Sequence, residues 1–197
     1  MSLVYRAFYR LGLTPWEQDE PEEALADLVT GPAALMPGRA LDVGCGTGTD
    51  AIFCARNGWQ VTGIDDVPLA LKRARAKATA AGVEVRFVRA DVTRAGPEHV
   101  GTGYQLLIDM GCLHNLDQRV RPAAGRLLTA VAAPGATLLM MAFATGGPKP
   151  GPVGLDAADV KAMFPDWDVA FSRPAHDVPL TGRMARAEPH YYQLVRR

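Results

Sequence analysis

The chain has 197 residues, of which 48% are hydrophobic and 21% charged, and its 21 basic and 21 acidic side chains leave no formal net charge. A chain of this length fits one domain, which would bury about 70% of the surface that the unfolded chain exposes. The balanced charge argues against a protein that holds a phosphate backbone by counterion release, so we expect no nucleic-acid partner.

The N-terminal residues predict a pair of short helices. Apolar residues from Ser2 to Leu11 recur with the spacing of one helix face, and Tyr5 and Tyr9 lie alongside it. A second helix is expected from Pro21 to Thr30, where Gly31-Pro32 ends it. No stretch of the chain approaches the ~20 apolar residues of a membrane span, and the three cysteines lack a disulfide spacing. We therefore expect a cytoplasmic protein with no membrane partner and no metal site.

Residues 41 to 48, Leu-Asp-Val-Gly-Cys-Gly-Thr-Gly, predict a ligand-binding turn between a strand and a helix. Strand character runs from Arg39 to Val43, and helical composition follows from about Thr49 to Asn57. Alternate glycines let the backbone reverse sharply and touch a ligand, although a purely structural turn is the alternative. The dinucleotide fingerprint instead reads Gly-x-Gly-x-x-Gly and binds a pyrophosphate, which Asp42 would repel. The turn suits an ammonium or a sulfonium better.

Acidic residues follow each of the next three predicted strands. Parallel strands end at one edge of a doubly wound sheet, where a ribose diol would lie. The strands and their acids are Trp59 to Ile64 with Asp65 and Asp66, Glu84 to Val88 with Asp91, and Tyr104 to Ile108 with Asp109. Asp66 has a second interpretation, because it can cap the helix that begins near Pro68 and ends at Gly82. The basic cluster from Lys72 to Lys77 is expected on the solvent face of that helix.

The second half of the chain predicts further helices and strands of the same kind. The apolar run from Ala136 to Phe143 is typical of an interior strand that is covered on both faces. The other expected elements are a loop over 93–103, a helix from about Arg121, a Gly- and Pro-rich loop over 145–154, a helix from the Asp156 cap to Phe164, and strands over 168–172 and 190–195 that a long connection over 174–188 joins.

The segments LDVGCGTG, VTGIDD, RADVT and LLIDMGCLHNL resemble the successive motifs of class I S-adenosylmethionine-dependent methyltransferases. The resemblance covers about Arg39 to Phe143, and Tyr9 to Glu17 is similar to the N-terminal region of thiopurine methyltransferase and tellurite-resistance methyltransferases. It implies an α/β fold with a doubly wound, Rossmann-like sheet of seven mostly parallel strands, an antiparallel last strand and helices on both faces. It also implies one methyltransferase domain over residues 1–197, with a helical cap over 1–31 and a cofactor-binding core over 39–197.

The same resemblance places S-adenosyl-L-methionine on this edge of the sheet. The methionine part would contact the glycine turn, the ribose would bind Asp65, and the adenine would lie at Asp91 and Val92. Trp16 is similar to a cap residue that closes over the cofactor, with a plain core tryptophan as the alternative. The expected cofactor-binding set is Trp16, Asp42, Gly44, Cys45, Gly46, Gly48, Asp65, Asp66, Asp91, Val92, Asp109, Met110 and Gly111.

Methyl transfer from a sulfonium is an in-line displacement, for which positioning supplies ~7–11 kcal/mol. A thiol with a pKa of ~8.5 provides some thiolate at neutral pH, whereas an alcohol or amine needs a base. His114 is the expected base and Asp109 the second catalytic residue, and a structural histidine that bonds a loop carbonyl is the alternative to the first role. The acceptor pocket is expected at Tyr5, Tyr9, His114 and Phe143, together with Trp16.

The sequence therefore predicts a methyltransferase that acts, as a monomer or homodimer, on a small thiol, phenol or other hydroxyl compound. Two other functions stay open: a protein that binds S-adenosylmethionine without transferring its methyl group, and an NAD-type dinucleotide oxidoreductase. The fourth strand leads into Asp109-Met110-Gly111-Cys112. Nucleic-acid methyltransferases usually carry Asn- or Asp-Pro-Pro-aromatic there to hold a flipped base, so the sequence favours a small acceptor.

Overall fold

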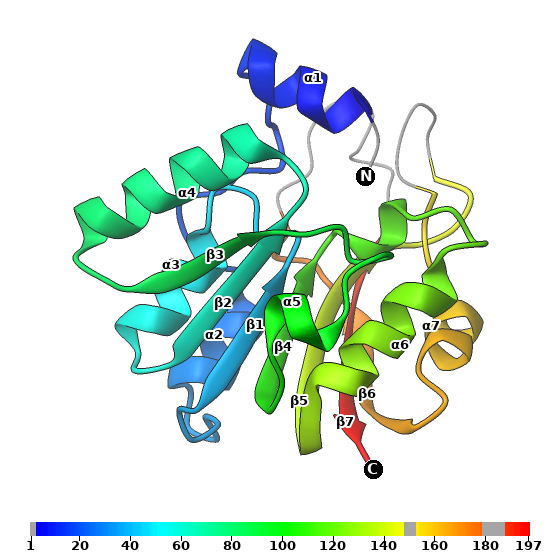
Figure 1. Cartoon of the computed structure of the whole chain (residues 1–197). Coiled ribbons are helices and arrows are strands. Elements are labelled where there is room, and N and C mark those ends of the chain that lie inside the picture. The colour runs from blue at the N-terminus through cyan, green and yellow to red at the C-terminus, as the bar shows by residue number, and fades with distance from the viewer. Residues whose placement is uncertain (1–2, 148–152, 179–187) are drawn as a thin grey trace.

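The computed structural model describes residues 3–147, 153–178 and 188–197 and shows a single sheet flanked by helices (Figure 1). The strands are β1 (Arg39–Val43), β2 (Gln60–Asp65), β3 (Val85–Arg89), β4 (Tyr104–Met110), β5 (Ala132–Phe143), β6 (Trp167–Pro174) and β7 (Pro189–Arg196). The helices are α1 (Leu3–Leu11), α2 (Glu23–Thr30), α3 (Thr49–Arg56), α4 (Pro68–Ala81), α5 (Pro97–Val100), α6 (Arg121–Val131) and α7 (Ala157–Met163), with a 3-10 turn η1 (Leu113–Asn115).

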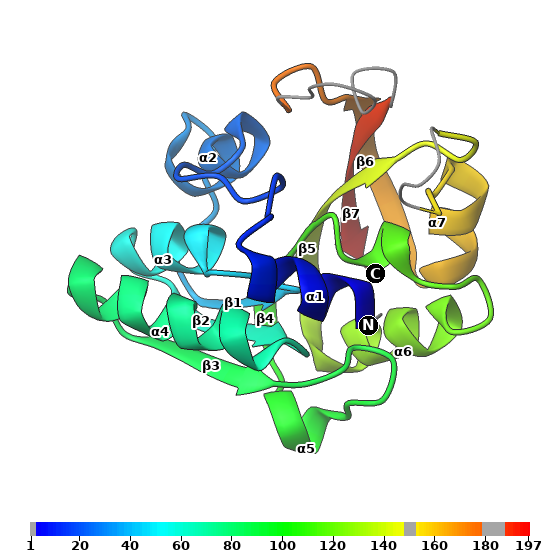
Figure 2. The same ribbon diagram turned by 90° about the horizontal axis from the view of Figure 1, so that it is seen from above.

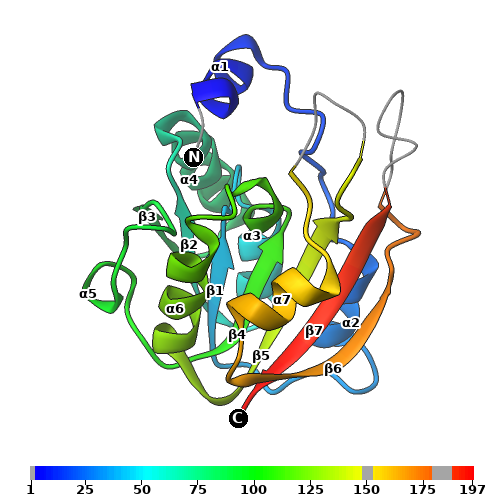
Figure 3. The ribbon, with the colours of Figure 1, turned by 90° about the vertical axis from the view of Figure 1, so that its right-hand side faces the viewer.

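The seven strands lie in the order β3-β2-β1-β4-β5-β7-β6. Strands β3, β2, β1, β4 and β5 pair in parallel, and β7 runs antiparallel to both β5 and β6 (Figure 3). The chain moves outward from β1 to β3 and then returns to add β4 on the other side of β1. This change of direction places a ligand-binding crevice beyond the carboxyl ends of β1 and β4. The predicted seven-stranded, doubly wound fold is confirmed.

Helices cover both faces of the sheet, as Figure 2 shows from above. Alternate residues of a strand point to opposite faces, so Ala40 packs with α2, α3 and α4, whereas Leu41 packs with α6 and α7. The strands are apolar on both faces because both are covered. This double burial fixes the ends of β1, β2 and β4, and therefore the positions of the polar residues that follow them.

Most predicted elements are present, with local differences in their bounds. Strand β5 begins at Ala132 rather than Ala136, a one-turn helix α5 lies within the expected loop over 93–103, and α2 begins at Glu23 rather than Pro21. The predicted cap of α7 is confirmed, because Asp156 accepts from the Asp159 amide at 2.9 Å. Parts of the two predicted loops, 148–152 and 179–187, lie outside the described residues.

Helix α1 lies above the carboxyl ends of the strands, on the same side as the glycine turn (Figures 1 and 3). The apolar face predicted between Ser2 and Leu11 is not buried throughout, because Leu11 is 69% exposed, whereas Tyr9 beside it is buried against Val67 and Ala70 at the start of α4. The buried side chain of Tyr9 therefore anchors α1 to the domain. Within the described parts of the chain, no helix is long and apolar enough to cross a membrane.

Candidate functional site

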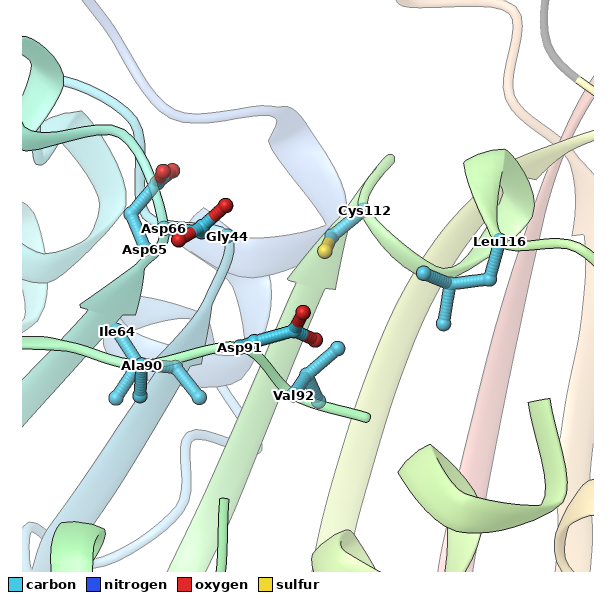
Figure 4. A pocket seen from close by; sticks show the side chains of 9 residues that line it. All are labelled: Gly44, Ile64, Asp65, Asp66, Ala90, Asp91, Val92, Cys112 and Leu116. Atoms are coloured by element: carbon cyan, nitrogen blue, oxygen red, sulfur yellow. The ribbon is translucent and has the colours of Figure 1, made fainter. Parts of the chain in front are cut away.

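A pocket opens where β1, β2 and β4 end and where the chain leaves β3 (Figure 4). Its lining residues are Gly44, Ile64, Asp65, Asp66, Ala90, Asp91, Val92, Cys112 and Leu116. Five of the residues predicted to bind the cofactor are thus brought together in one place, although they come from three different strand ends. The pocket combines three carboxylates with an apolar floor, which suits a ribose beside a planar base.

The glycine turn is held by hydrogen bonds from each of its first four amides. The amides of Gly44 and Cys45 both donate to the Ile64 carbonyl, at 2.8 and 3.0 Å. The Gly46 amide donates to Asp65 at 3.1 Å, and the Thr47 amide donates to Glu17 at 3.3 Å. A pyrophosphate-binding turn must offer such amides to the ligand. This turn instead uses them within the protein, so it is poorly suited to an anion.

The glycines of the turn are required by contacts with the protein as well as by any ligand. A Cβ atom at Gly44, whose φ is +71°, would lie 2.5 Å from Cβ of Cys112. A Cβ atom at Gly48, whose φ is +84°, would lie 3.0 Å from the ring of Phe87 and 3.2 Å from Ala74. Gly48 therefore lets α4 and β3 approach the turn closely, which is a packing role that the sequence did not suggest.

Asp65 and Asp66 have different partners, and neither caps α4 in the predicted way. Asp65 accepts from the Gly46 amide and, at 2.7 Å, from the Val67 amide, so it ties the glycine turn to the start of α4. Asp66 instead forms an ion pair with Arg6 of α1 at 2.8 Å and lies 3.8 Å from Arg89. The predicted cap at Asp66 is wrong, because the N-cap position is Val67 and Asp65 already receives its amide.

Asp42 is the most strongly perturbed acid beside the turn. Its side chain is 2% exposed, and among the described residues its Oδ2 atom has no hydrogen-bond partner. Burial, followed by repulsion from Asp65, raises its pKa to about 8. The Asp50 carboxyl, which is half-buried, also has a raised pKa, first through burial and then through Asp42. A ligand cation next to these carboxyls would stabilise their charged forms.

Asp109 lies at the end of β4 and organises the loop that follows it. Its Oδ1 accepts from the amides of Cys112 and Leu113, at 2.8 and 3.1 Å. Burial raises its pKa to about 7, although the same two hydrogen bonds act in the opposite direction. The side chain therefore faces its own loop and sets the path of residues 110–114; its predicted catalytic role stays a prediction.

His114 follows on this loop and is 3% exposed. Its Nδ1 accepts from the Phe143 amide at 3.3 Å, and its ring lies 5.1 Å from the Phe143 ring. Burial lowers its pKa to about 4, and the nearby charge of Arg121 acts in the same direction. The imidazole is thus neutral at physiological pH, as a base must be. The ring also lies close to Gly111, since a Cβ atom at that glycine would be 3.1 Å from Cε1 of His114.

Arg121, which the sequence did not single out, holds together the segments that surround His114. Its guanidinium is 3% exposed, donates to the Leu116 and Gly154 carbonyls at 3.1 and 2.5 Å, and pairs with Asp159 at 3.1 Å. The Gly154 amide in turn donates to the His114 carbonyl at 3.0 Å. One buried cation therefore joins the histidine loop, the end of the 145–154 loop and α7.

The rings predicted to line the acceptor pocket form two groups. Trp16 is surrounded by Tyr5, Phe8 and Tyr9, with ring centroids 5.1, 5.5 and 6.0 Å away. The second group is the pair of His114 and Phe143 already described. Burial, and then the charge of the Cys112 thiolate, raise the pKa of Tyr5 to about 12. Trp16 itself is 40% exposed, which differs from a plain core tryptophan.

The residues and their charges fit a cofactor that carries a cation and a ribose. The unpartnered oxygen of Asp42 suits an ammonium group, and the pocket carboxylates suit a diol. Among the described residues, no group of three or more His, Cys, Asp or Glu side chains is arranged to hold a metal ion.

Comparison with known proteins agrees with this geometry. The profile of a family described as a methyltransferase domain matches residues 40–135. The 2-heptyl-1-hydroxyquinolin-4(1H)-one methyltransferase of Mycobacteroides abscessus is 28% identical over 134 residues, which are 66% of this chain and 56% of that protein. The probable thiol methyltransferase 2 of Arabidopsis thaliana is 30% identical over 147 residues, which are 71% of this chain and 63% of that protein. This chain thus spans less than two thirds of the length of either relative.

The fold extends the likeness over the whole chain. The N-methyltransferase NodS of Bradyrhizobium japonicum, solved with S-adenosyl-L-homocysteine, matches with a TM-score of 0.76 and 14% identity, and the match covers 99% of each chain. The matched profile and the fold make the chain similar to the class I S-adenosylmethionine-dependent methyltransferases. Its cofactor is S-adenosylmethionine, which confirms the prediction from the motifs.

The position of α1 leads to a prediction about this methyltransferase's lid, which we define as residues 3–16. A nine-residue helix is too short to be stable without tertiary contacts. We expect the lid to exchange its amide hydrogens rapidly in the free protein and more slowly once S-adenosyl-L-homocysteine is bound. Hydrogen exchange with mass spectrometry measures both states. Equal exchange in the two states would show that the lid does not respond to the cofactor.

Proposed function

We propose that this methyltransferase transfers a methyl group from S-adenosylmethionine to a small thiol or hydroxyl compound. The observation that carries the proposal is the charge pattern of the glycine turn. The first four amides of the turn donate to acceptors within the protein. A buried oxygen of Asp42 has no hydrogen-bond partner among the described residues. The turn therefore favours a cationic ligand over a pyrophosphate. This pattern weighs against the NAD-type oxidoreductase.

The acceptor class is supported by the rings and by the relatives. The expected walls are apolar and aromatic, with His114 as the one titratable group besides the tyrosines, and they would hold a planar or soft nucleophile without an ion pair. One relative's name refers to a hydroxyquinolinone and the other's to a thiol. When bound, the cofactor supplies an electrophilic methyl group on a positively charged sulfur. The chain's own part is to hold the acceptor, exclude water and, for a hydroxyl, receive its proton.

The residues proposed for the cofactor keep the roles that the resemblance implies. Asp42 and the glycine turn would hold the methionine part, Asp65 the ribose, and Asp91 with Val92 the adenine. Met110 and Gly111 would lie near the sulfur, where the Gly111 carbonyl already accepts from Asn115 at 2.7 Å. Cys45 would take part through its backbone alone, because its thiol is buried and burial raises its pKa.

Two measurements test the proposal. Calorimetry should show one equivalent of S-adenosylmethionine or S-adenosyl-L-homocysteine bound per chain and no heat with NAD. A panel of thiols, phenols and amines with methyl-labelled cofactor should then show transfer to thiols or phenols. Binding of NAD alone would contradict the cofactor assignment. Cofactor binding with no transfer to any acceptor class would leave the second candidate, a binding protein without transferase activity.

A further inference from the structure

The residue after Trp16 connects the lid to the glycine turn. The Glu17 carboxylate accepts from the Tyr9 hydroxyl at 2.6 Å and from the Thr47 amide at 3.3 Å, and it also bonds the Thr47 hydroxyl. Burial, and then this hydrogen bond, raise the pKa of Tyr9, so the phenol stays a donor. One carboxylate therefore joins a buried ring of α1 to the turn that carries the cofactor motif.

This contact also accounts for the middle glycine of the turn. A Cβ atom at Gly46 would lie 3.0 Å from Oε1 of Glu17 and 3.0 Å from the Tyr9 hydroxyl. Any side chain at Gly46 would press against both groups. The lid and the turn are therefore packed against each other at this position, with the carboxylate of Glu17 between them.

Two neighbouring hydrogen bonds support the same junction from α3 and α4. The Thr49 hydroxyl donates to the Gln18 carbonyl at 2.7 Å, and Lys77 donates to the Thr47 hydroxyl at 3.0 Å. Lys77 belongs to the basic cluster that the sequence places on the solvent face of α4. Lys77 is exposed, as that prediction expects, and its ammonium also reaches the side chain that Glu17 holds. The junction thus gathers one anion and one cation around the hydroxyl of Thr47.

We propose that Glu17 is a positioning residue for cofactor binding, which holds the glycine turn and the lid in the arrangement that receives S-adenosylmethionine. The proposal rests on this family's cofactor and on no particular acceptor. Glu17 itself need not touch the cofactor. It accepts the hydrogen bond of the Thr47 amide, which an anionic ligand would otherwise receive. It also keeps the turn packed against α1. Closing of the lid and binding of the cofactor are thereby coupled.

The other polar contacts that hold α1 to the domain are weaker candidates for this role. The Arg6 to Asp66 pair has one partner 37% exposed, and partly exposed ion pairs contribute little. Arg73 holds only the Tyr9 carbonyl, at 3.3 Å, and does not reach the turn. Among these contacts, the one through Glu17 links the lid directly with residues 46 and 47.

The experiment measures the dissociation constant of S-adenosyl-L-homocysteine by calorimetry for the wild type, Glu17→Ala and Glu17→Gln. We expect Glu17→Ala to weaken binding about tenfold or more, which is the loss expected for a hydrogen bond to a charged group. In Glu17→Ala, hydrogen exchange of residues 3–16 should stay as fast with the ligand as it is in the free protein, whereas in the wild type it slows when the ligand is added. Glu17→Gln, which keeps the shape of the side chain, should lie between the two.

The control is Glu20→Ala, an exposed acid three residues farther along the same segment, which should bind the ligand like the wild type. A double-mutant cycle with Thr47→Ala separates positioning from a general loss of stability. We expect the double variant to bind no worse than Glu17→Ala alone, because both changes break one junction. Full additivity, or unchanged binding and exchange in both Glu17 variants, would overturn the proposal. A wild type that binds no S-adenosyl-L-homocysteine would instead contradict the cofactor assignment.

Discussion

Asp65→Ala should weaken the binding of S-adenosyl-L-homocysteine by at least about 100-fold. In its proposed role Asp65 would make two charge-assisted hydrogen bonds to the ribose, each worth on the order of 1.5–3 kcal/mol, and the substitution would remove both. In the protein, the Asp65 carboxylate already accepts from the Gly46 and Val67 amides. A carboxylate has about four acceptor positions, so two remain for a diol. Asp65→Ala would also leave two backbone amides without this acceptor, which loosens the turn.

The matched control is Asp66→Ala. It removes a neighbouring acid of the same pocket and breaks the ion pair with Arg6, yet leaves the glycine turn intact. We expect it to weaken binding far less than Asp65→Ala, and calorimetry compares the two directly. The reverse order of the two variants would transfer the ribose role to Asp66. Thermal melting of both variants without ligand shows whether Asp65→Ala acts on binding or on the fold.

Local sequence signals were sufficient where one stretch of chain decides its own structure. The glycine turn, the strand before it and the Asp156 cap could all be predicted, because strand pattern, backbone freedom and capping act within a few residues. The seven-stranded topology came from the resemblance, and the acids that follow successive strands indicated the edge of the sheet where a ligand would bind. The edge positions of Asp65 and Asp91 followed from the same logic.

Contacts between distant segments could not be predicted in this way. Glu17 was visible only as part of a motif, because its partners Tyr9 and Thr47 lie 8 and 30 residues away. A cap of α4 was one of two interpretations of Asp66, and nothing in its sequence neighbourhood indicates that Arg6 would reach it. Arg121 looked like an ordinary first-turn residue of a helix, and its burial depends on α7 and the 145–154 loop. In each case the deciding partner is fixed by tertiary packing.

The tautomer of His114 decides whether the residue can act as a base. If Nδ1 accepts from the Phe143 amide, the proton of the neutral ring is on Nε2, and the ring can only donate to an acceptor molecule. A hydrogen bond to the Met141 backbone raises the pKa of His114 and needs a ring N–H as its donor; only the tautomer in which Nδ1 is that donor leaves Nε2 free to receive a proton. Nitrogen chemical shifts of the imidazole distinguish the two states.

With a phenol acceptor, His114→Ala should lose about 10²–10⁴-fold in rate, because a phenol with a pKa of ~10 needs a base at pH 7. With a thiol acceptor, the loss should be small. His114→Gln is the shape-matched control, since it keeps polar contacts to the β5 backbone but cannot take a proton. Equal rates for wild type and both variants on both acceptors would leave His114 structural and the transfer driven by positioning alone.

The pH dependence gives an independent check. Because burial lowers the pKa of His114 to about 4, the base is neutral well below the usual histidine range. Protonation of His114 should therefore reduce phenol methylation only as the pH approaches 4, rather than near the ordinary value of ~6.5. The unfolded chain binds this proton more tightly than the folded one, so the free energy of unfolding also falls as the pH drops from the ordinary histidine pKa toward the lowered one. Rates should therefore be compared only at pH values where thermal melting shows that the protein is still folded. The opposite result would be a loss of rate centred near the ordinary histidine pKa in the wild type but not in His114→Gln. It would show that the imidazole is more hydrated in the working enzyme than its burial in this structure implies.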